Sequence, residues 1–318
     1  SVAAELNTIH SPEIRSDFTF LPAHFPLYPL LIRLGATVGL GYYQSMLFIS
    51  LGFSLAMVVT FYFLARQLHL ASPLLLSLPL LILPPRWFIV SHTGSSEPIF
   101  LCFVLLSLLL YYRKSPWLSA ISGSMALLAR PQGALLGLAY LVIAAIDLYR
   151  SQEHYGSKAL RHALRRYAPY LLIPLTLLGI FGFYYRQTGD FWAFFHSIAV
   201  FHHFRFSLFP TFNYGAVNIE TFWQEANVMY YFLYLFTIVK LITRPKHYQL
   251  GILGIIFYLP LIFLQHSDIS RYSLPLMPLV FIAFAPSIAD KKFTLAGFLL
   301  LPAIFLYAAN FMLNNHAP

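Results

Sequence analysis

Residues 42–64 read YYQSMLFISLGFSLAMVVTFYFL, a stretch of 23 residues without one charged side chain. A helix needs about 20 apolar residues to cross a bilayer. Only helices and closed barrels satisfy their backbone polar groups there, and the sequence lacks the alternating pattern of a barrel. Further apolar runs occupy 74–90, 97–112, 117–129, 133–148, 168–185, 228–242, 248–264, 272–288 and 293–311. These runs predict an all-α polytopic membrane protein with about 10 transmembrane helices.

The composition agrees with a membrane location. The chain has 318 residues, of which 59% are hydrophobic and 10% are charged. A soluble domain is about 45–50% apolar and about 25% charged, so too little charge is present to coat a water-soluble enzyme. The chain has a single cysteine, Cys102, which excludes a disulfide framework and a cysteine-based metal site.

Basic residues gather in alternate connections between the runs. Those connections hold 13 of the 20 Lys and Arg residues and three acids, a balance of +10, against −1 for the other side. The positive-inside rule makes the first side cytoplasmic. The net charge of +9 is then a topology signal, which predicts membrane lipids rather than nucleic acid as partners. The opposite, extracytoplasmic side carries the two long segments, 1–41 and 186–227, the second of which is rich in aromatic residues.

One candidate site lies where an outer connection meets the run at 97–112. Ser96 is a predicted helix N-cap, Pro98 follows in the first turn, and Glu97 stands at the positive end of the helix dipole. Glu97 is either a capping carboxylate alone or, because its surroundings are apolar, a functional acid. His92 precedes it on the same side.

Two arginines on the outer side run against the positive-inside bias. Arg130 breaks the apolar stretch at 117–148 within Arg130-Pro131-Gln132, so that two short helices or a re-entrant hairpin are expected. Arg271 follows Asp268 and precedes Tyr272 and an apolar run. Each arginine suits phosphate binding, Arg271 beside a helix N-terminus. The alternatives are a Glu-paired arginine that holds two helices together and an Asp268–Arg271 surface pair.

A last stretch, FPLYPLLIR (Phe25–Arg33), follows His24 just before the run at 42–64. Its prolines fix an extended or turning entry, and Tyr28 supplies a ring at headgroup depth. Taken together, the outer side combines carboxylates with arginines. A carboxylate can deprotonate an attacking hydroxyl, and cations can stabilise a phosphate that leaves.

Four stretches carry a resemblance to a known family: FPLYPLLIR, SSEPIF (Ser95–Phe100), ARPQG (Ala129–Gly133) and RYSLPLMPL (Arg271–Leu279). In this order and on this side of the membrane, they resemble the integral-membrane GT-C mannosyltransferases, in particular the PIG-V-like proteins of the second GPI mannosyltransferase family and its prokaryotic homologues. The resemblance implies a single GT-C-type domain over 1–318, and a sugar donor linked to polyprenyl or dolichyl phosphate. It also implies transfer to a hydroxyl of a glycolipid or other acceptor on the extracytoplasmic or lumenal face.

The same resemblance implies roles for individual residues. Glu97 would be catalytic, and Arg130 and Arg271 would contact the donor phosphate. The site would be shaped by His24, Phe25, Pro26, Tyr28, Pro29, His92, Ser96, Gln132, Asp268 and Tyr272. The family's first outer loop carries a Trp-Asp pair that would fall just upstream of Ser1. We therefore expect segment 1–41 to be the rest of that loop, an eleventh span to precede it, and the usual catalytic Asp to lie there.

Other interpretations stay open on the sequence alone. Interrupted helices with charged residues at depth also occur in transporters and lipid flippases. The long segment 186–227 also allows a lipid-linked glycan polymerase or ligase. No cofactor or metal ligand set is predicted, although a divalent cation is compatible with phosphate chemistry. A prokaryotic plasma membrane is favoured over the endoplasmic reticulum because the sequence has no Asn-x-Ser/Thr sequon.

Overall fold

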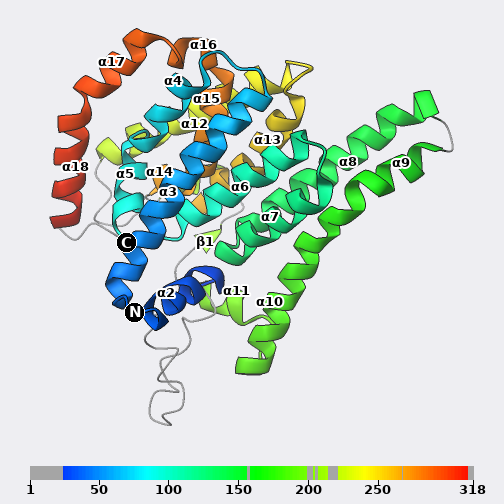
Figure 1. Cartoon of the computed structure of the whole chain (residues 1–318), viewed down its shortest axis with the longest axis horizontal. Helices are drawn as coiled ribbons and strands as arrows, with labels where there is room; N and C mark the ends of the chain where they lie inside the picture. The colour runs from blue at the N-terminus through cyan, green and yellow to red at the C-terminus, as the bar shows by residue number, and fades with distance from the viewer. Residues whose placement is uncertain are drawn as a thin grey trace.

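The computed structural model describes residues 24–155, 158–198, 203–204, 207–213, 221–266 and 268–313 (Figure 1). In these residues the chain is almost entirely helical. The described strands are β1 (His203–Phe204) and β2 (Leu264–Gln265), which pair antiparallel. The helices are α2 (Leu27–Thr37), α3 (Tyr42–Gln67), α4 (Pro73–Ser77), η3 (Leu78–Leu81), α5 (Pro85–His92), α6 (Glu97–Tyr112), α7 (Pro116–Ala129), α8 (Gly133–Tyr155), α9 (Lys158–Tyr167), η4 (Ala168–Leu171), α10 (Leu172–Thr188), α11 (Ala193–Ile198), η5 (Pro210–Asn213), α12 (Thr221–Ile242), α13 (Tyr248–Ile262), α14 (Ile269–Tyr272), η6 (Leu274–Leu276), α15 (Met277–Ala283), α16 (Ala285–Ile288), α17 (Lys291–Leu299) and α18 (Leu301–Leu313).

Among the described residues, four helical stretches are long and apolar enough to cross a membrane: Tyr42–Gln67, Gly133–Arg150, Ala163–Thr188 and Gln224–Ile242. The number rises to six if each of two bent helix pairs is one span. An all-α membrane protein is thus confirmed, but the predicted count of about 10 is not. A count of 10 would be reached only if the four shorter apolar helices also crossed the membrane. Among these, α7 with its 14 residues is about 21 Å long, against a hydrocarbon core of about 30 Å.

Three predicted runs are interrupted where proline removes a backbone donor. The run at 74–90 bends by 65° between η3 and α5, beside Pro84 and Pro85. The run at 293–311 bends by 43° between α17 and α18, where Pro302 opens the second helix. The run at 272–288 divides into α14, η6, α15 and α16. By contrast, the break predicted at Arg130-Pro131 lies where expected, between α7 and α8.

The outward surfaces of the long helices are apolar. In the four spans, at most 33% of the most hydropathic window is buried inside the protein. Leu55, Leu175, Phe232 and Phe236 are among the large side chains left exposed. Lipid acyl chains cover such surfaces without cost, which agrees with a membrane-embedded bundle.

Inside the bundle, small polar residues bring helices together. Ser107 Oγ of α6 donates to the Ser119 carbonyl of α7 at 2.8 Å, and Ser119 Oγ returns a bond of 2.7 Å to the Ser107 carbonyl. Tyr140 of α8 places its hydroxyl 2.8 Å from Ser107 Oγ. Small residues that allow close approach and bond across helices are typical of membrane helix packing.

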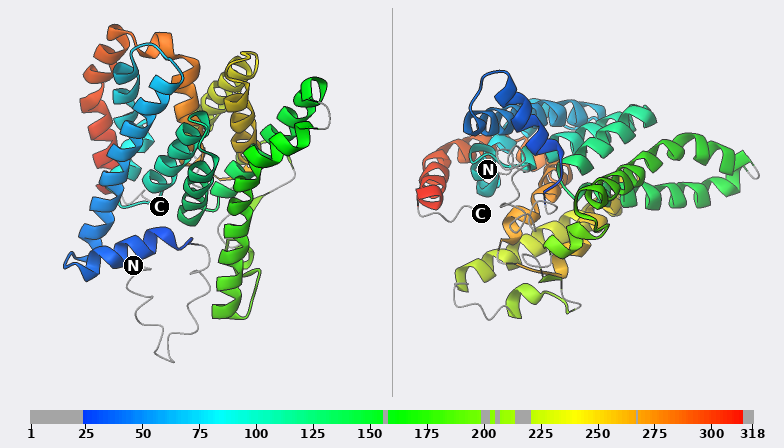
Figure 2. Two further views of the ribbon diagram at one scale, coloured as in Figure 1. Left: turned by 45° about the vertical axis from the view of Figure 1, so that its right-hand side comes forward. Right: turned by 90° about the horizontal axis from the view of Figure 1, so that it is seen from below.

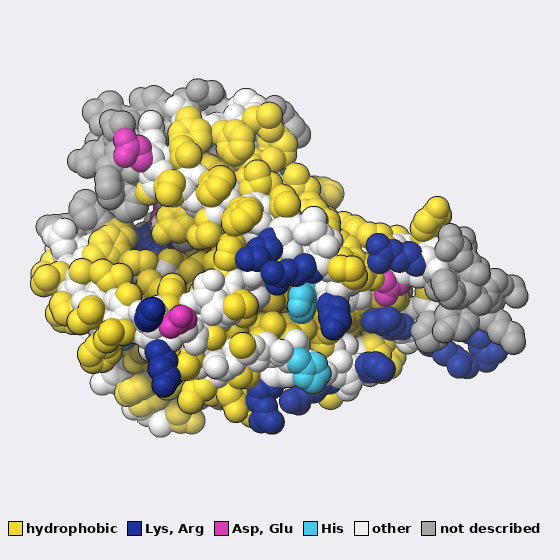
Figure 3. All heavy atoms as spheres, turned by 90° about the horizontal axis from the view of Figure 1, so that it is seen from above, with side chains coloured by type: hydrophobic (Ala, Val, Ile, Leu, Met, Phe, Trp, Pro, Cys, Tyr) yellow, Lys and Arg dark blue, Asp and Glu magenta, His cyan; other side chains and the backbone are white. Residues whose placement is uncertain are grey.

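The two ends of the bundle differ. Helix α2 lies across one end of the bundle, next to the start of α3 (Figure 2). Figure 3 shows the opposite end, where Lys and Arg side chains are spread over the surface and outnumber the acidic ones. This end is called the basic face below. Such a distribution is the one that the positive-inside rule associates with the cytoplasm. The α8–α9 hairpin projects sideways from the bundle (Figure 1).

The two long predicted loops are described only in part. Residues 1–23 of segment 1–41 lie outside the described residues, and α2 fills most of the remainder. In segment 186–227, residues 199–202, 205–206 and 214–220 lie outside them. Its described parts contain α11, β1 and η5. The pairing of β1 with β2, and a bond of 2.6 Å from Thr211 Oγ1 to the His266 carbonyl, attach this segment to the connection before α14.

Candidate functional site

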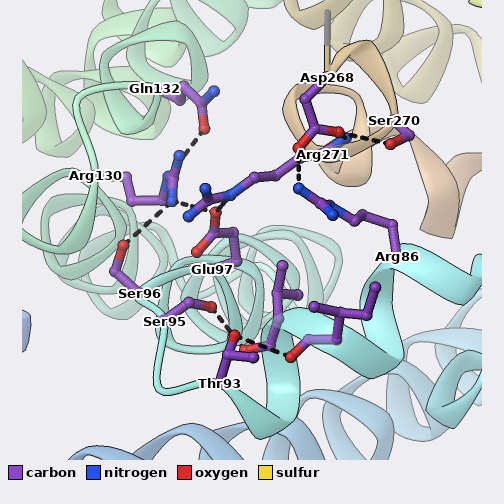
Figure 4. A network of polar contacts seen from close by, with 12 residues as sticks. Arg86, Thr93, Ser95, Ser96, Glu97, Arg130, Gln132, Asp268, Ser270 and Arg271 are labelled. Atoms are coloured by element: carbon purple, nitrogen blue, oxygen red, sulfur yellow. Dashed lines mark hydrogen bonds and ion pairs between the residues drawn. The ribbon is translucent and has the colours of Figure 1, made fainter. Parts of the chain in front are cut away.

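Three separated stretches meet at the first residue of α6. The Glu97 side chain is only 4% exposed, and its Oε1 atom lies 2.7 Å from Arg130 Nη1 and 2.5 Å from Arg271 Nε (Figure 4). Arg130 follows α7 and Arg271 belongs to α14. The residues that the sequence analysis selected on the outer side are therefore in direct contact, and the Glu-paired alternative for Arg130 describes part of this arrangement.

Ser96 has a different role from the predicted one. It occupies the N-cap position of α6, but its side chain makes no capping hydrogen bond. Its Oγ instead accepts a bond of 3.2 Å from Arg130 Nη1. Because Glu97 opens the helix, its carboxylate stands beside the positive end of the helix dipole, as predicted.

Arg130 is held by the break between α7 and α8. Helix α7 ends at Ala129, and Arg130 adopts an extended conformation with φ −151° and ψ 144°. Pro131 favours this conformation because it disfavours the helical region for the residue before it. Gln132 Oε1 then accepts a bond of 3.2 Å from Arg130 Nε. Gln132 thus fixes one side of the guanidinium while Ser96 and Glu97 fix the other.

Arg271 and Asp268 do not form the predicted surface pair. The Arg271 side chain reaches Glu97, whereas Asp268 pairs with Arg86 of α5. Asp268 Oδ1 also caps α14, accepting from the Arg271 backbone N–H at 3.2 Å and from Ser270 Oγ at 2.7 Å. The N-terminus of α14 is therefore capped by a carboxylate of the chain, and the phosphate expected beside Arg271 stays a prediction.

The role of Arg86 was not predicted from the sequence. This side chain is 4% exposed, bonds to Asp268, and stacks its guanidinium over the Phe311 ring of α18 with 4.3 Å from Cζ to the centroid. Its signal in the sequence is a lone arginine after Pro84-Pro85 within an apolar run. An ionisable residue in such a run is a functional candidate. Its partner, however, lies 182 residues away in the chain.

The cluster has a surplus of positive charge. It unites the guanidinium groups of Arg86, Arg130 and Arg271 with the carboxylates of Glu97 and Asp268. Arg130 and Arg271 remain 15% and 19% exposed, so each keeps an accessible edge. Among the described residues, Glu97 Oε2 is buried and has no hydrogen-bond partner. The arrangement can accept a small anion on the arginines.

The FPLYP stretch contacts the residues that lead into α6. Burial raises the pKa of Tyr28 to about 12, so its hydroxyl stays protonated. That hydroxyl lies 3.3 Å from Ser50 Oγ, which donates at 2.9 Å to the Ser95 carbonyl just before Glu97. Phe25 is buried, with its ring 5.2 Å from that of Phe194 in α11. Pro29 is buried in α2, and Pro26 is the N-cap of this helix.

Two predicted residues, His92 and His24, lie apart from the ion-pair cluster, whereas Tyr272 adjoins the cluster as the neighbour of Arg271 in α14. His92 is exposed, and its Nδ1 bonds within α5 to the Phe88 carbonyl at 2.7 Å. His24 is exposed, and its carbonyl accepts a bond of 3.0 Å from the Tyr184 hydroxyl. Tyr272 packs its ring against His266, with 4.8 Å between centroids. Across the described ranges, no group of three or more His, Cys, Asp or Glu side chains could hold a metal ion.

The candidate site is therefore identified by the chemistry and geometry of its residues. No protein-family model, curated protein or solved structure matches the chain.

Proposed function

We propose that this protein is a membrane-embedded glycosyltransferase of the GT-C type. It transfers a hexose, mannose by the resemblance above, from a polyprenyl- or dolichyl-phosphate donor to a hydroxyl of a glycolipid or other acceptor. The reaction takes place on the extracytoplasmic face of a prokaryotic plasma membrane, or on the lumenal face of the endoplasmic reticulum.

One observation supports this proposal most: Arg130 and Arg271 converge on one oxygen of Glu97 from distant parts of an apolar chain. Taking charges out of water is costly, and a bundle held only by packing needs none of them. A lipid-linked sugar phosphate needs cations at membrane depth because its prenyl tail stays in the bilayer. The accessible edges of the two guanidinium groups can supply them.

In this proposal the arginines bind the donor phosphate and stabilise the negative charge that grows on it as the bond to the anomeric carbon breaks. Glu97 holds both arginines through Oε1. Once the donor phosphate has taken up the arginines, the Glu97 carboxylate accepts the proton of the attacking hydroxyl. The glycosyl group is transferred with inversion, because a single displacement forms one bond as the other breaks.

The test is sugar transfer from a polyprenyl-phosphate donor in membranes that contain the full-length protein. Arg130→Ala and Arg271→Ala should each lower the rate by about a hundredfold or more, as expected when a charged group leaves a transition-state site. Glu97→Gln keeps an oxygen for the arginines but removes the proton acceptor, and should also be slow. Arg244→Ala changes an exposed arginine between α12 and α13, and serves as the matched control.

Wild-type rates in all three site variants would refute the proposal, provided that the variants are present in the membrane at wild-type amounts. A transporter gives a different result in the same membranes. A chemical label would then reach Arg130→Cys alternately from the two sides of the bilayer, whereas the transferase leaves it accessible from one side.

A further inference from the structure

The α8–α9 hairpin has a surface that the ion-pair cluster does not use. It projects sideways from the bundle, so the other helices leave much of it uncovered (Figures 1 and 2). Between residues 150 and 166 the sequence carries five Lys and Arg residues and one acid, Glu153. The hairpin is therefore strongly cationic.

Helix α9 has an apolar stripe that extends past the edge of the bundle. Leu160, Leu164 and Tyr167 are spaced by four and three residues, so they share one face of the helix. Tyr167 is buried, and its hydroxyl bonds to Asp147 of α8. Leu160 and Leu164 are 55% and 56% exposed. The stripe is thus anchored to the protein at one end and uncovered at the other.

Two arginines accompany the uncovered leucines. Arg161 and Arg165 are one helical turn apart, and both are exposed. Their neighbour Arg166 is already used, because its Nη1 atom lies 3.4 Å from Asp147 and its Nη2 donates to the Tyr111 hydroxyl at 3.0 Å. Arg161 and Arg165 therefore present charge to the surroundings next to apolar side chains.

The chain that follows α9 indicates what surrounds Leu160, Leu164 and the two arginines. Helix α9 passes through η4 into α10, and Ala163–Thr188 is apolar enough to cross a membrane. The end of α9 therefore lies at the membrane boundary, where leucines enter the acyl region and arginines reach the headgroup level. We propose that Leu160, Arg161, Leu164 and Arg165 form a binding surface for anionic phospholipids, with the headgroup phosphate on the arginines.

The charge of this surface favours an anionic lipid over a zwitterionic one. Each basic residue close to an anionic leaflet contributes about a fivefold preference. A nucleic acid or an acidic protein would satisfy the arginines but would leave Leu160 and Leu164 uncovered, so the combination fits a bilayer better. The inference does not depend on the proposed transferase activity.

The experiment compares lipid selection in nanodiscs that contain the full chain and equal amounts of phosphatidylglycerol and phosphatidylcholine. The protein is released from the discs, and the lipids that remain bound are counted by native mass spectrometry. The double variant Arg161→Gln/Arg165→Gln should lower the phosphatidylglycerol preference at least about fivefold. Arg161→Lys/Arg165→Lys keeps both charges at the same positions and should stay close to the wild-type preference. An equal fall in both variants, or none in the first, would overturn the proposal.

A second experiment measures the polarity around the exposed leucines. The only cysteine of the chain, Cys102, is buried, so a polarity-sensitive fluorophore can be attached at Leu160→Cys. Its emission should shift to the blue in phosphatidylglycerol discs, and the shift should diminish when Arg161 and Arg165 are replaced by glutamine. Emission typical of water in every lipid mixture would show that α9 stands away from the bilayer.

Discussion

The pair between Arg86 and Asp268 explains why Arg271 reaches Glu97. Asp268 bonds to Arg86 through Oδ2 and to the Arg271 backbone through Oδ1, so it connects α5 to the turn that carries Arg271. Both partners are largely buried, at 4% and 14% side-chain exposure. Removal of one partner leaves an uncompensated buried charge, which costs more than removal of both.

Asp268→Asn should therefore lower the free energy of unfolding by about 3 kcal/mol, because it leaves Arg86 without its counterion. The double variant Arg86→Leu/Asp268→Asn should lose less than the sum of the two single variants. Unfolding in detergent by titration with sodium dodecyl sulfate measures all three differences. Additive losses would show that the two side chains do not interact.

His266 adds a pH dependence to the same turn. Its Nδ1 accepts a bond of 2.9 Å from the Asp268 N–H, which requires an unprotonated nitrogen. Burial lowers the pKa of His266 below its ordinary value of 6.5, and the nearby Arg271 and Arg86 act in the same direction, although Asp268 opposes them. The unfolded chain then binds the proton more readily, so the contribution of His266 is fully present above pH 6.5 and is lost as the pH falls.

We expect the wild type to lose more stability between about pH 7.5 and about pH 5.5 than His266→Asn, whose side-chain oxygen can accept the same bond without titrating. The comparison uses the same detergent titration at several pH values. Identical pH profiles for the two proteins would remove His266 as the titrating group.

At the level of elements, the break between α7 and α8 depends on Gly133. A Cβ atom at this position would overlap the backbone of Leu127 and lie 2.8 Å from the Ala126 carbonyl carbon. The start of α8 thus packs directly on the last turns of α7, and Arg130 projects from the connection between them. A larger residue must push the two helices apart and displace Arg130.

Gly133→Ala should accordingly destabilise the protein by about 1–3 kcal/mol and weaken donor binding, as expected for overpacking of a tight contact. Gly179→Ala is the matched control, since a Cβ atom at this position of α10 meets nothing within 4 Å. The control should be near neutral. The two variants are compared by thermal unfolding in detergent and by the KM for the lipid-linked donor. Equal behaviour of both would show that the close approach at Gly133 is not required.

The same elements show what hydropathy predicts and what it misses. The charge-free run at 42–64 becomes one continuous helix, α3, because it has no proline and its length exceeds the bilayer core. The run at 272–288 is also apolar, yet it divides into short helices because prolines at 275, 278 and 286 remove backbone donors. An average of hydropathy over a window is insensitive to these single prolines. For this reason the predicted number of spans exceeds the number of helices that are long enough to cross a membrane.

For the whole molecule, residue chemistry predicted four of the five members of the ion-pair cluster, all but Arg86, and it did not predict the partner of Asp268. Glu97, Arg130 and Arg271 were selected because each interrupts an apolar environment on the side with little basic charge. Nothing in the local sequence shows that Asp268 pairs with Arg86 rather than with Arg271, since that choice depends on how α5 and α14 pack. The capping of α14 by Asp268 could have been anticipated from Asp268-Ile269-Ser270-Arg271, which is a typical N-terminal helix sequence.

The sidedness of the bundle is the remaining prediction at this scale, and single cysteines can test it. Cys102 is buried, so a membrane-impermeant maleimide on intact cells should report only introduced sites. Gln187→Cys, exposed at the end of α10, should react from outside. Arg113→Cys after α6 and Lys246→Cys before α13, both exposed, should react only after permeabilisation. The expectation follows from the basic residues around positions 113 and 246 and their absence between 187 and 198. If all three cysteines reacted from one side, the chain would cross the membrane an even number of times between positions 113, 187 and 246. The ion-pair cluster and the basic face would then lie in the same compartment. That result would contradict an extracytoplasmic site.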